Sequence, residues 1–293
     1  MSDQVTFAHV LQFTTNVKHK LQQMGSKLRG TVMTGQHVGK GAVPVEQIGS
    51  VVAQIRESRH SDTPILDTPH SRRWVFPTDY EWGDMVDKQD IIRMLIDPKS
   101  PYTEAAVNAM GRQVDDIIIA AATATSTVGA VTGGGDTTTE AFGAGFVVTA
   151  AGGLTNLVLA DVWKRFATAE LDMDREQMYF VISPREAEEL FTTFGTTYTS
   201  QDFVNQKPLP TGALPPHLGF NFIVSNRLVR TAGVTRCIAY AKSGIHLGLW
   251  NDIEVKADQR VDKGFNWQLY VRMSAGATRL EQGRVIAVDV TNP

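Results

Sequence analysis

The clearest hydrophobic pattern in the chain is a stripe at helical spacing that runs from Ala106 to Ala122. Its members recur every three or four residues, which places them on one face of an α-helix. Ser100 can cap the N-terminus of this helix, and Pro101 suits its first position. The pattern predicts a helix of about 22 residues and about 33 Å, long enough to cross a domain. The stripe consists of Ala106, Met110, Val114, Ile117, Ile118, Ala121 and Ala122.

The polar flank of this predicted helix carries Arg112 and Asp116, which are four residues apart. Opposite charges at this spacing are neighbours on a helix surface, so we expect an ion pair between them. The order of the two charges is the weaker one, because a basic residue that precedes its acidic partner opposes the helix dipole.

A second pattern, with a period of two, lies between Arg72 and Trp82. Its aromatic residues occupy even positions, so in a strand they would share one face. Pro77 restricts such a strand to a sheet edge or a projecting ribbon. Full burial of the intervening charges would be costly, which favours an extended hairpin laid over a neighbouring copy, with a core strand as the alternative. The predicted assembly interface consists of Arg72, Arg73, Trp74, Phe76, Tyr80 and Trp82.

The rest of the chain alternates between shorter helices and strands. Helical spacing recurs at 45–58 and 154–166, and strand patterns dominate roughly the last hundred residues. An apolar strand at 178–182 is followed by Ser183 and Pro184, which open another helix. This order of elements predicts an α+β fold.

Composition adds a preference for contact with other protein. The 293 residues, 42% of them hydrophobic, suffice for a sizeable core, but only 20% are charged, which is below the usual quarter. The net charge of −3 gives no overall attraction to polyanions, so contact with nucleic acid would need a local patch. The first sixty residues or so are predicted to be an arm, or alternatively a solvated terminal segment. The basic residues singled out in this arm are Lys18, Lys20, Lys27 and Arg29.

Compartment signals are few. Cys237 is the only cysteine, which excludes an intrachain disulfide. The first residues do not combine a basic stretch with an apolar core, and no run of about 18 apolar residues occurs. We therefore expect a soluble protein that is made inside the cell and has no membrane contact.

No motif in the chain anchors an enzymatic reaction. The glycines Gly133 to Gly135 are not followed by the Lys-Ser or Lys-Thr of a phosphate loop, and Asp136 would repel a phosphate. The seven histidines are dispersed without metal-ligand spacing, and we expect His246 to face outward from a strand. No Gly-x-Ser-x-Gly turn presents a nucleophile. We therefore expect no catalytic residue, metal, cofactor or small-molecule substrate.

The order of these elements resembles that of the major capsid proteins of tailed bacteriophages, which have the Hong Kong 97-type fold. The likeness runs from about Ser71 to the C-terminus. It rests mainly on an extended loop that leads into a long helix, and on a strand and turn in the C-terminal half. These two stretches read RRWVFPTDYEWGDMVDKQDIIRMLIDPKSPYTEAAVNAMGRQVDDIII and LGFNFIVSNRL.

The resemblance implies a structural protein that assembles into hexamers and pentamers of an icosahedral head around double-stranded DNA. It implies a location in the virion capsid, assembly in the bacterial host cytoplasm, and portal and scaffolding proteins as partners. The basic arm residues would contact the DNA or a neighbouring subunit. It also divides the chain into an N-terminal arm, an extended β-hairpin loop, a spine helix with peripheral-domain elements, an axial domain, and C-terminal strands that return to the peripheral domain. Their ranges are 1–59, 60–96, 97–174, 175–245 and 246–293.

Three other functions stay open at this point. An encapsulin-like compartment would share the fold and would hold an enzyme cargo in place of DNA. A phage tail or decoration protein would be rich in strands and self-associating, but it would lack the long helix. A nucleotide-binding enzyme that uses Gly133 to Gly135 would be a compact monomer or dimer.

Overall fold

The computed structural model describes most of the chain, in eight segments. These are residues 22–39, 43–56, 58–59, 65–66, 68–86, 99–129, 138–197 and 214–291. The chain divides into two compact units. The first unit comprises Met1–Ser26, Thr78–Val114 and Trp250–Ala275, and the second comprises Lys27–Pro77, Asp115–Leu249 and Gly276–Pro293.

The second unit is built on a six-stranded sheet in the order β7-β14-β11-β8-β9, with β10 paired to β11. β11 lies antiparallel to both β14 and β8, whereas the outer strands β7 and β9 are parallel to their neighbours. The strands are β7 (Val147–Ala150), β8 (Met178–Ile182), β9 (Phe220–Val224), β10 (Arg230–Thr231), β11 (Val234–Ala241) and β14 (Val285–Thr291).

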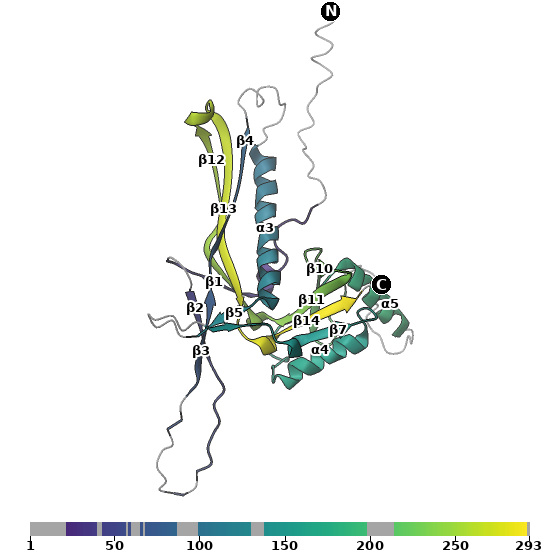
Figure 1. Cartoon of the computed structure of the whole chain (residues 1–293). Helices are drawn as coiled ribbons and strands as arrows, with labels where there is room; N and C mark the ends of the chain where they lie inside the picture. The colour runs from purple at the N-terminus through teal and green to yellow at the C-terminus, as the bar shows by residue number, and fades with distance from the viewer. Residues whose placement is uncertain are drawn as a thin grey trace, which may run out of the picture. The chain divides into compact units, whose positions relative to one another are not determined.

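Two helices complete this α+β core. α4 (Asn156–Thr168) buries Leu159, Val162 and Phe166, whose spacing of three and four forms one face, and it packs against β7 (Figure 1). The ring of Phe166 lies 6.1 Å from that of Phe220 on β9. α5 (Pro184–Thr197) begins with a capping box, in which the backbone N–H of Ser183 donates to Glu186 Oε2 at 3.1 Å. The strand-to-helix turn at Ser183 and Pro184 is therefore confirmed.

The second unit also contains a smaller antiparallel sheet in the order β2-β3-β5-β6. Its strands are β2 (Val43–Ile48), β3 (His70–Val75), β5 (Ser126–Val128) and β6 (Thr138–Glu140). The helix expected at 45–58 is wrong, because β2 occupies its first residues and the described residues after it have no regular structure. Cross-strand pairing with β3 outweighs the helical spacing of the β-branched residues, and Arg72 on β3 pairs with Glu46 on β2 at 2.8 Å.

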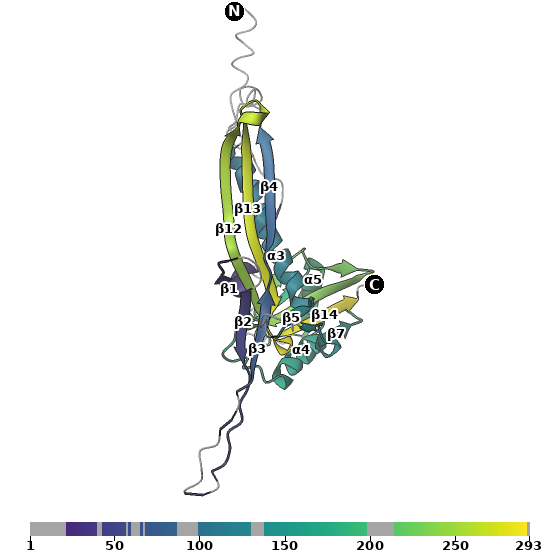
Figure 2. The ribbon, with the colours of Figure 1, turned by 60° about the vertical axis from the view of Figure 1, so that its left-hand side comes forward.

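The first unit is a sheet accompanied by a long helix. β4 (Thr78–Val86) pairs antiparallel with β13 (Asn266–Arg279) from Thr78 opposite Ala275 to Val86 opposite Trp267, and β12 (Ile245–Arg260) lies on the other side of β13. α3 (Lys99–Thr123) runs alongside these strands (Figures 1 and 2). Its length of 25 residues confirms the predicted long helix, and most of the predicted apolar stripe is buried.

The chain passes between the two units after Ser26, after Pro77, and within α3, β12 and β13. In the second unit, the start of β12 also pairs with β1 (Met33–Gln36), which is parallel to it. Among the described residues, no helix has the length and apolar character needed to cross a bilayer. Short 3-10 turns connect several strands: Arg29–Thr31, Ala144–Phe146, Lys242–Gly244, Val261–Lys263 and Gln282–Arg284.

The extended strand predicted from Arg72 to Trp82 is interrupted at Pro77. β3 pairs with β2 and β5, whereas β4 pairs with β13, so the two strands on either side of Pro77 belong to different sheets. Between β3 and β4 the backbone passes very close to β13. This approach requires a glycine at position 276 of β13, because a Cβ there would lie 2.0 Å from the carbonyl oxygen of Phe76. An extended antiparallel hairpin does exist, but β2 and β3 form it, joined by the connection at 49–69.

Candidate functional site

The feature most suited to contact with another molecule is the β2–β3 ribbon, which we define as β2, β3 and the described residues of their connection. The ladder continues past the strand ends, since the N–H of Gly49 donates to the Pro69 carbonyl at 2.8 Å. Beyond this point the described residues extend away from the strands (Figures 1 and 2). The large apolar side chains exposed on the ribbon are Ile48, Val51, Val52, Ile55, Ile65 and Leu66.

These side chains form an unusual amount of exposed apolar surface for one segment. Ile55 is 92% exposed and Ile65 is 95% exposed, so they gain almost nothing from packing within their own chain. Apolar side chains gathered in this way mark a surface that another protein covers. The ribbon thus has the physical character of an interaction element.

The base of the ribbon is fixed to its own unit. Arg73 Nε donates to the carbonyl oxygen of Leu280 at 2.6 Å, and its guanidinium forms an ion pair with Glu140. Trp74 Nε1 donates to the Gly129 carbonyl at 3.0 Å, and Val75 is buried. The ribbon is therefore anchored at one end by buried and half-buried groups and carries its exposed apolar residues at the other.

The six residues predicted as an interface separate into two groups. Arg72, Arg73 and Trp74 lie on β3 in the second unit, where their side chains are half-buried and have partners within the chain. Tyr80 and Trp82 lie on β4 in the first unit, half-buried, opposite the buried residues Met273 and Val271. Phe76 is 53% exposed, the most accessible aromatic residue of the set. Their role in assembly stays a prediction.

The described arm residues are held by α3. Within the first unit the N–H of Gly25 donates to Asn108 Oδ1 at 3.0 Å, and within the second unit the buried carboxylate of Asp115 accepts the backbone N–H groups of Lys27 and Leu28 at 3.1 and 3.0 Å. The ammonium group of Lys27 donates to the Val224 carbonyl at 2.8 Å. Arg29 is half-buried, and Lys18, Lys20 and Gly133 to Gly135 lie outside the described residues.

The ion pair expected between Arg112 and Asp116 is wrong. Arg112 Nη1 donates to Gln22 Oε1 at 3.0 Å and to the Gln23 carbonyl at 3.1 Å. Asp116 instead accepts a hydrogen bond from Arg227 Nε at 2.8 Å, which raises the pKa of the Arg227 guanidinium. Each charge has found a partner distant in sequence, and these contacts outcompete the weakly favourable local pairing.

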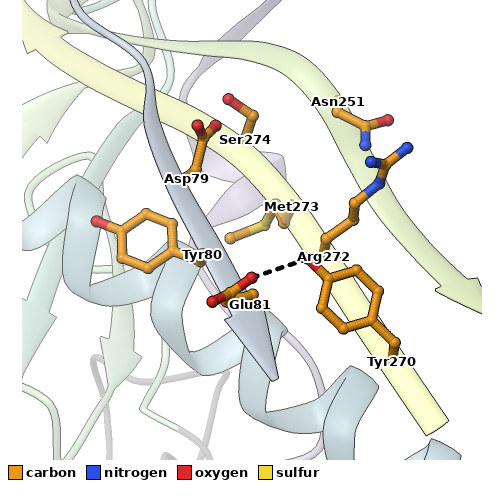
Figure 3. Close-up of a pocket in the computed structure, with 8 residues that line it drawn as sticks. All are labelled: Asp79, Tyr80, Glu81, Asn251, Tyr270, Arg272, Met273 and Ser274. Atoms are coloured by element: carbon orange, nitrogen blue, oxygen red, sulfur yellow. Dashed lines mark hydrogen bonds between the residues drawn. The ribbon is translucent and has the colours of Figure 1, made fainter. Parts of the chain in front are cut away.

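An open cavity of about 550 Å³, lined by both polar and apolar groups, lies on the first unit over β4, β13 and β12 (Figure 3). Tyr270 Oη donates to Glu81 Oε2 at 2.8 Å across its floor. Arg272 donates to Glu254 Oε2 at 2.7 Å, and hydrogen bonds from Arg272, Lys256 and Asn251 lower the pKa of Glu254 to about 2. The charges that surround the cavity largely neutralise one another, which suits a solvated sheet face.

Among the histidines, the structure contradicts the prediction made for His246. His246 does not face outward, because it is buried and its Nε2 lies 3.0 Å from Nε2 of His37. The two residues are 209 positions apart, so no local spacing could have indicated the pair. Within the described segments, no group of three or more His, Cys, Asp or Glu side chains could hold a metal ion.

A long helix beside an extended sheet, an α+β unit on a six-stranded sheet and an anchored, projecting ribbon together characterise the Hong Kong 97-type capsid fold. A capsid structure of the cyanophage P-SCSP1u has a TM-score of 0.74 at 15% identity, covering 96% of this chain and 93% of that chain. The capsid of Ralstonia phage GP4 gives 0.70 at 10% identity, with 96% of both chains covered. The capsid of an empty GTA particle gives 0.68 at 12% identity, covering 99% and 98%. No curated protein matches the sequence.

The chain belongs to the phage capsid protein family, whose model, described as phage capsid protein, matches residues 5–292. It is a major capsid protein that forms the shell of a phage head, and the family is one of structural proteins. The compartment-shell and nucleotide-binding alternatives are not favoured.

Proposed function

We propose that this major capsid protein assembles into hexamers and pentamers of an icosahedral head that encloses double-stranded DNA. Assembly takes place in the cytoplasm of the bacterial host, with portal and scaffolding proteins as partners. The observation that carries the proposal is the β2–β3 ribbon, which exposes its apolar residues on the single chain. Because the chain belongs to a capsid family, we infer that a second copy of the chain covers these residues.

Burial of the apolar side chains of the ribbon would stabilise the contact between subunits. Covering one Val, Leu or Ile side chain completely contributes about 1.5–3 kcal/mol, so the exposed residues of one ribbon form a substantial but not extreme contact. A closed shell repeats that contact by symmetry, and many moderate contacts then give a stable assembly without a single tight site. A ribbon anchored through Arg73 and Trp74 also reduces the ordering cost of binding, because its base is already fixed.

The division of the chain is correspondingly revised. The extended loop is best taken as the β2–β3 ribbon at 43–75, where 60–96 was expected, since β4 pairs with β13 in the first unit. The arm then ends before residue 43 instead of at 59. The first unit takes the part of a peripheral domain and the six-stranded sheet that of an axial domain. Phe76 is the member of the predicted aromatic set best placed to contact a neighbour, because it is exposed.

Contact with the packaged DNA is proposed to be non-specific and to involve the basic arm residues. The net charge of −3 requires such a contact to be local. The candidates are Lys18, Lys20, Lys27 and Arg29. The ammonium of Lys27 already donates to Val224, so Lys27 would contribute less. Binding of this kind weakens steeply with salt.

The ribbon proposal is tested by replacing Ile55 and Ile65 together. The double variant Ile55→Ser/Ile65→Ser removes exposed apolar groups, so it leaves the chain folded by circular dichroism and thermal unfolding but prevents closed shells in negative-stain micrographs and sedimentation velocity. The matched control Ile55→Val/Ile65→Val keeps an apolar surface and still forms shells. Shells of normal size and yield from the serine variant would contradict a role for the ribbon in assembly.

A further inference from the structure

The imidazole pair formed by His37 and His246 has a geometry that depends on protonation. The two Nε2 atoms are 3.0 Å apart, a hydrogen-bond distance, and the ring centroids are 5.3 Å apart with planes inclined at 56°. A hydrogen bond between two imidazoles requires one nitrogen to donate and the other to accept. The pair can therefore hold one proton between its Nε2 atoms, and a second proton there would set two N–H groups against each other.

The site is closely built. His246 is 8% exposed, and a Cβ on Gly35 would lie 2.8 Å from its Cε1, so the ring fits only because residue 35 has no side chain. Gly35 lies on β1 opposite Gly248, and the N–H of His37 donates to the Leu249 carbonyl at 2.9 Å. The imidazole bond thus lies where the ladder between β1 and β12 ends.

The surroundings also fix the tautomer. Nδ1 of His246 is buried and has no hydrogen-bond partner among the described residues. A buried N–H without an acceptor is rarer in proteins than a carbonyl-type acceptor without a donor, so we assign the proton of His246 to Nε2, which donates to Nε2 of His37. A metal ion bridging both Nε2 atoms would force that proton onto Nδ1, where no acceptor waits, so the geometry disfavours a metal here.

We propose that the His37–His246 pair is a proton-sensitive clasp that holds β1 on β12 while His37 is neutral and releases β1 when His37 takes up a proton from solvent. Protonation of His37 at Nε2 removes the acceptor that the Nε2–H of His246 uses and breaks the hydrogen bond between the two rings. The half-buried ring of His37 is the accessible member of the pair. His246 is buried, and its hydrogen bond to His37 is lost when His37 becomes charged.

The pKa values of the two histidines and the charged groups near His246 support the release of β1 on protonation. Burial first, and the charge of His37 second, lower the pKa of His246 to about 4, while burial lowers the pKa of His37. On β13, the neighbouring strand, the charged residue of the second unit is Arg279, whose guanidinium donates to the carbonyls of Ala122 and Ala124. Lys242 in the turn before β12 is exposed. His37 is the charged group that acts on His246.

The lowered pKa values determine how the stability that the clasp contributes changes with pH. A base whose pKa is lower in the folded chain than its ordinary 6.5 favours its neutral form when folded. Burial also lowers the pKa of His37, the group that takes up the proton, so the clasp contributes fully above about pH 6.5 and its contribution is lost as the pH falls through the lowered pKa of His37. Release is local, because the chain before β1 is held separately by the hydrogen bond between Thr31 Oγ1 and Tyr240 Oη at 2.6 Å. The freed segment is the link between that anchor and β2.

Hydrogen exchange on the intact chain tests the clasp. Between pH 8 and pH 5, after correction for intrinsic exchange, protection of the amides at 33–37 is expected to fall roughly tenfold or more, while amides of β11 stay protected. His37→Gln keeps an acceptor that cannot titrate, so its protection at 33–37 should not depend on pH. His217→Gln, at another histidine whose pKa burial lowers, is the matched control and should behave like the natural chain.

The clasp is a property of the single chain, so its outcome does not depend on whether shells form. An unchanged protection of 33–37 between pH 8 and 5 in the natural chain, or the same loss in His37→Gln, would overturn the proposal. If His37→Gln alters the fold, Gly35→Ala provides the second variant. Its Cβ displaces the His246 ring, so β1 should exchange quickly at pH 8 as well, and retained protection at pH 8 would also count against the clasp.

Discussion

At the scale of single residues, the chain relies on a few buried polar groups whose partners lie far away in sequence. Asp115 on α3 is buried and accepts two backbone N–H groups from Lys27 and Leu28. Arg279 is 1% exposed, its guanidinium donates to the carbonyl of Ala122 in α3 and to that of Ala124 just after the helix, and its Cζ lies 4.8 Å from the Phe142 ring centroid. These groups join the arm and the terminal strands to the helix, and none belongs to a recognisable sequence motif.

Asp115 gives the residue-scale prediction. Asp115→Ala removes the acceptor of the buried Leu28 N–H and of the partly buried Lys27 N–H, so the free energy of unfolding should fall by about 2–3 kcal/mol. Asp115→Asn retains one acceptor oxygen and should cost less. Urea denaturation of the two variants measures the difference. Equal stability of Asp115→Ala and the natural chain would show that the arm is not held by this carboxylate.

At the scale of elements, the sequence predicts helices better than sheet partners. The stripe on α3 is a local pattern with a period of 3.6, so it identifies the helix correctly. The alternation between Arg72 and Trp82 also indicates strands correctly, but not which strands they pair with. β3 finds β2 and β5, and β4 finds β13 almost two hundred residues later, which no spacing within the segment encodes.

Gly276 gives the element-scale prediction, because the change of sheet between β3 and β4 requires it. In Gly276→Ala the new Cβ would lie 2.0 Å from the Phe76 carbonyl oxygen, and the neighbours Val75, Thr78 and Ala275 are held in sheet ladders, so a shift of either segment would strain them. We expect a loss of about 3 kcal/mol or more in the free energy of unfolding. Gly152→Ala, where the added Cβ meets nothing within 4 Å, is the control and should be nearly neutral in urea denaturation.

A result in which Gly276→Ala and Gly152→Ala have the same unfolding midpoint would contradict the close approach of Phe76 to β13. The two substitutions add the same methyl group, so any general effect of replacing glycine in the unfolded chain cancels between them. The difference in unfolding midpoint between the two variants therefore reports the contact between residue 276 and the Phe76 carbonyl.

At the scale of the whole molecule, the class of protein can be predicted from the sequence, whereas the exposure of the β2–β3 ribbon cannot. The order of elements and the lack of reactive motifs pointed to a capsid, and the family match supports that class. The local aromatic pattern predicts an interface that includes Trp74 and Trp82, whose side chains are half-buried, and this role stays a prediction. Ile55 lies in the stretch where spacing predicts a short helix and Ile65 in the predicted extended loop, and neither pattern indicates their exposure, since exposure depends on pairing between distant strands.

We propose that the chain forms a closed head from hexamers and pentamers. Cryo-electron microscopy of particles from the full chain, expressed alone and with its neighbouring genes, tests this proposal most directly. We expect icosahedral shells in which each β2–β3 ribbon lies against a neighbouring copy, with Ile55 and Ile65 covered. A small discrete oligomer under every condition, or shells in which these residues stay exposed to solvent, would contradict it.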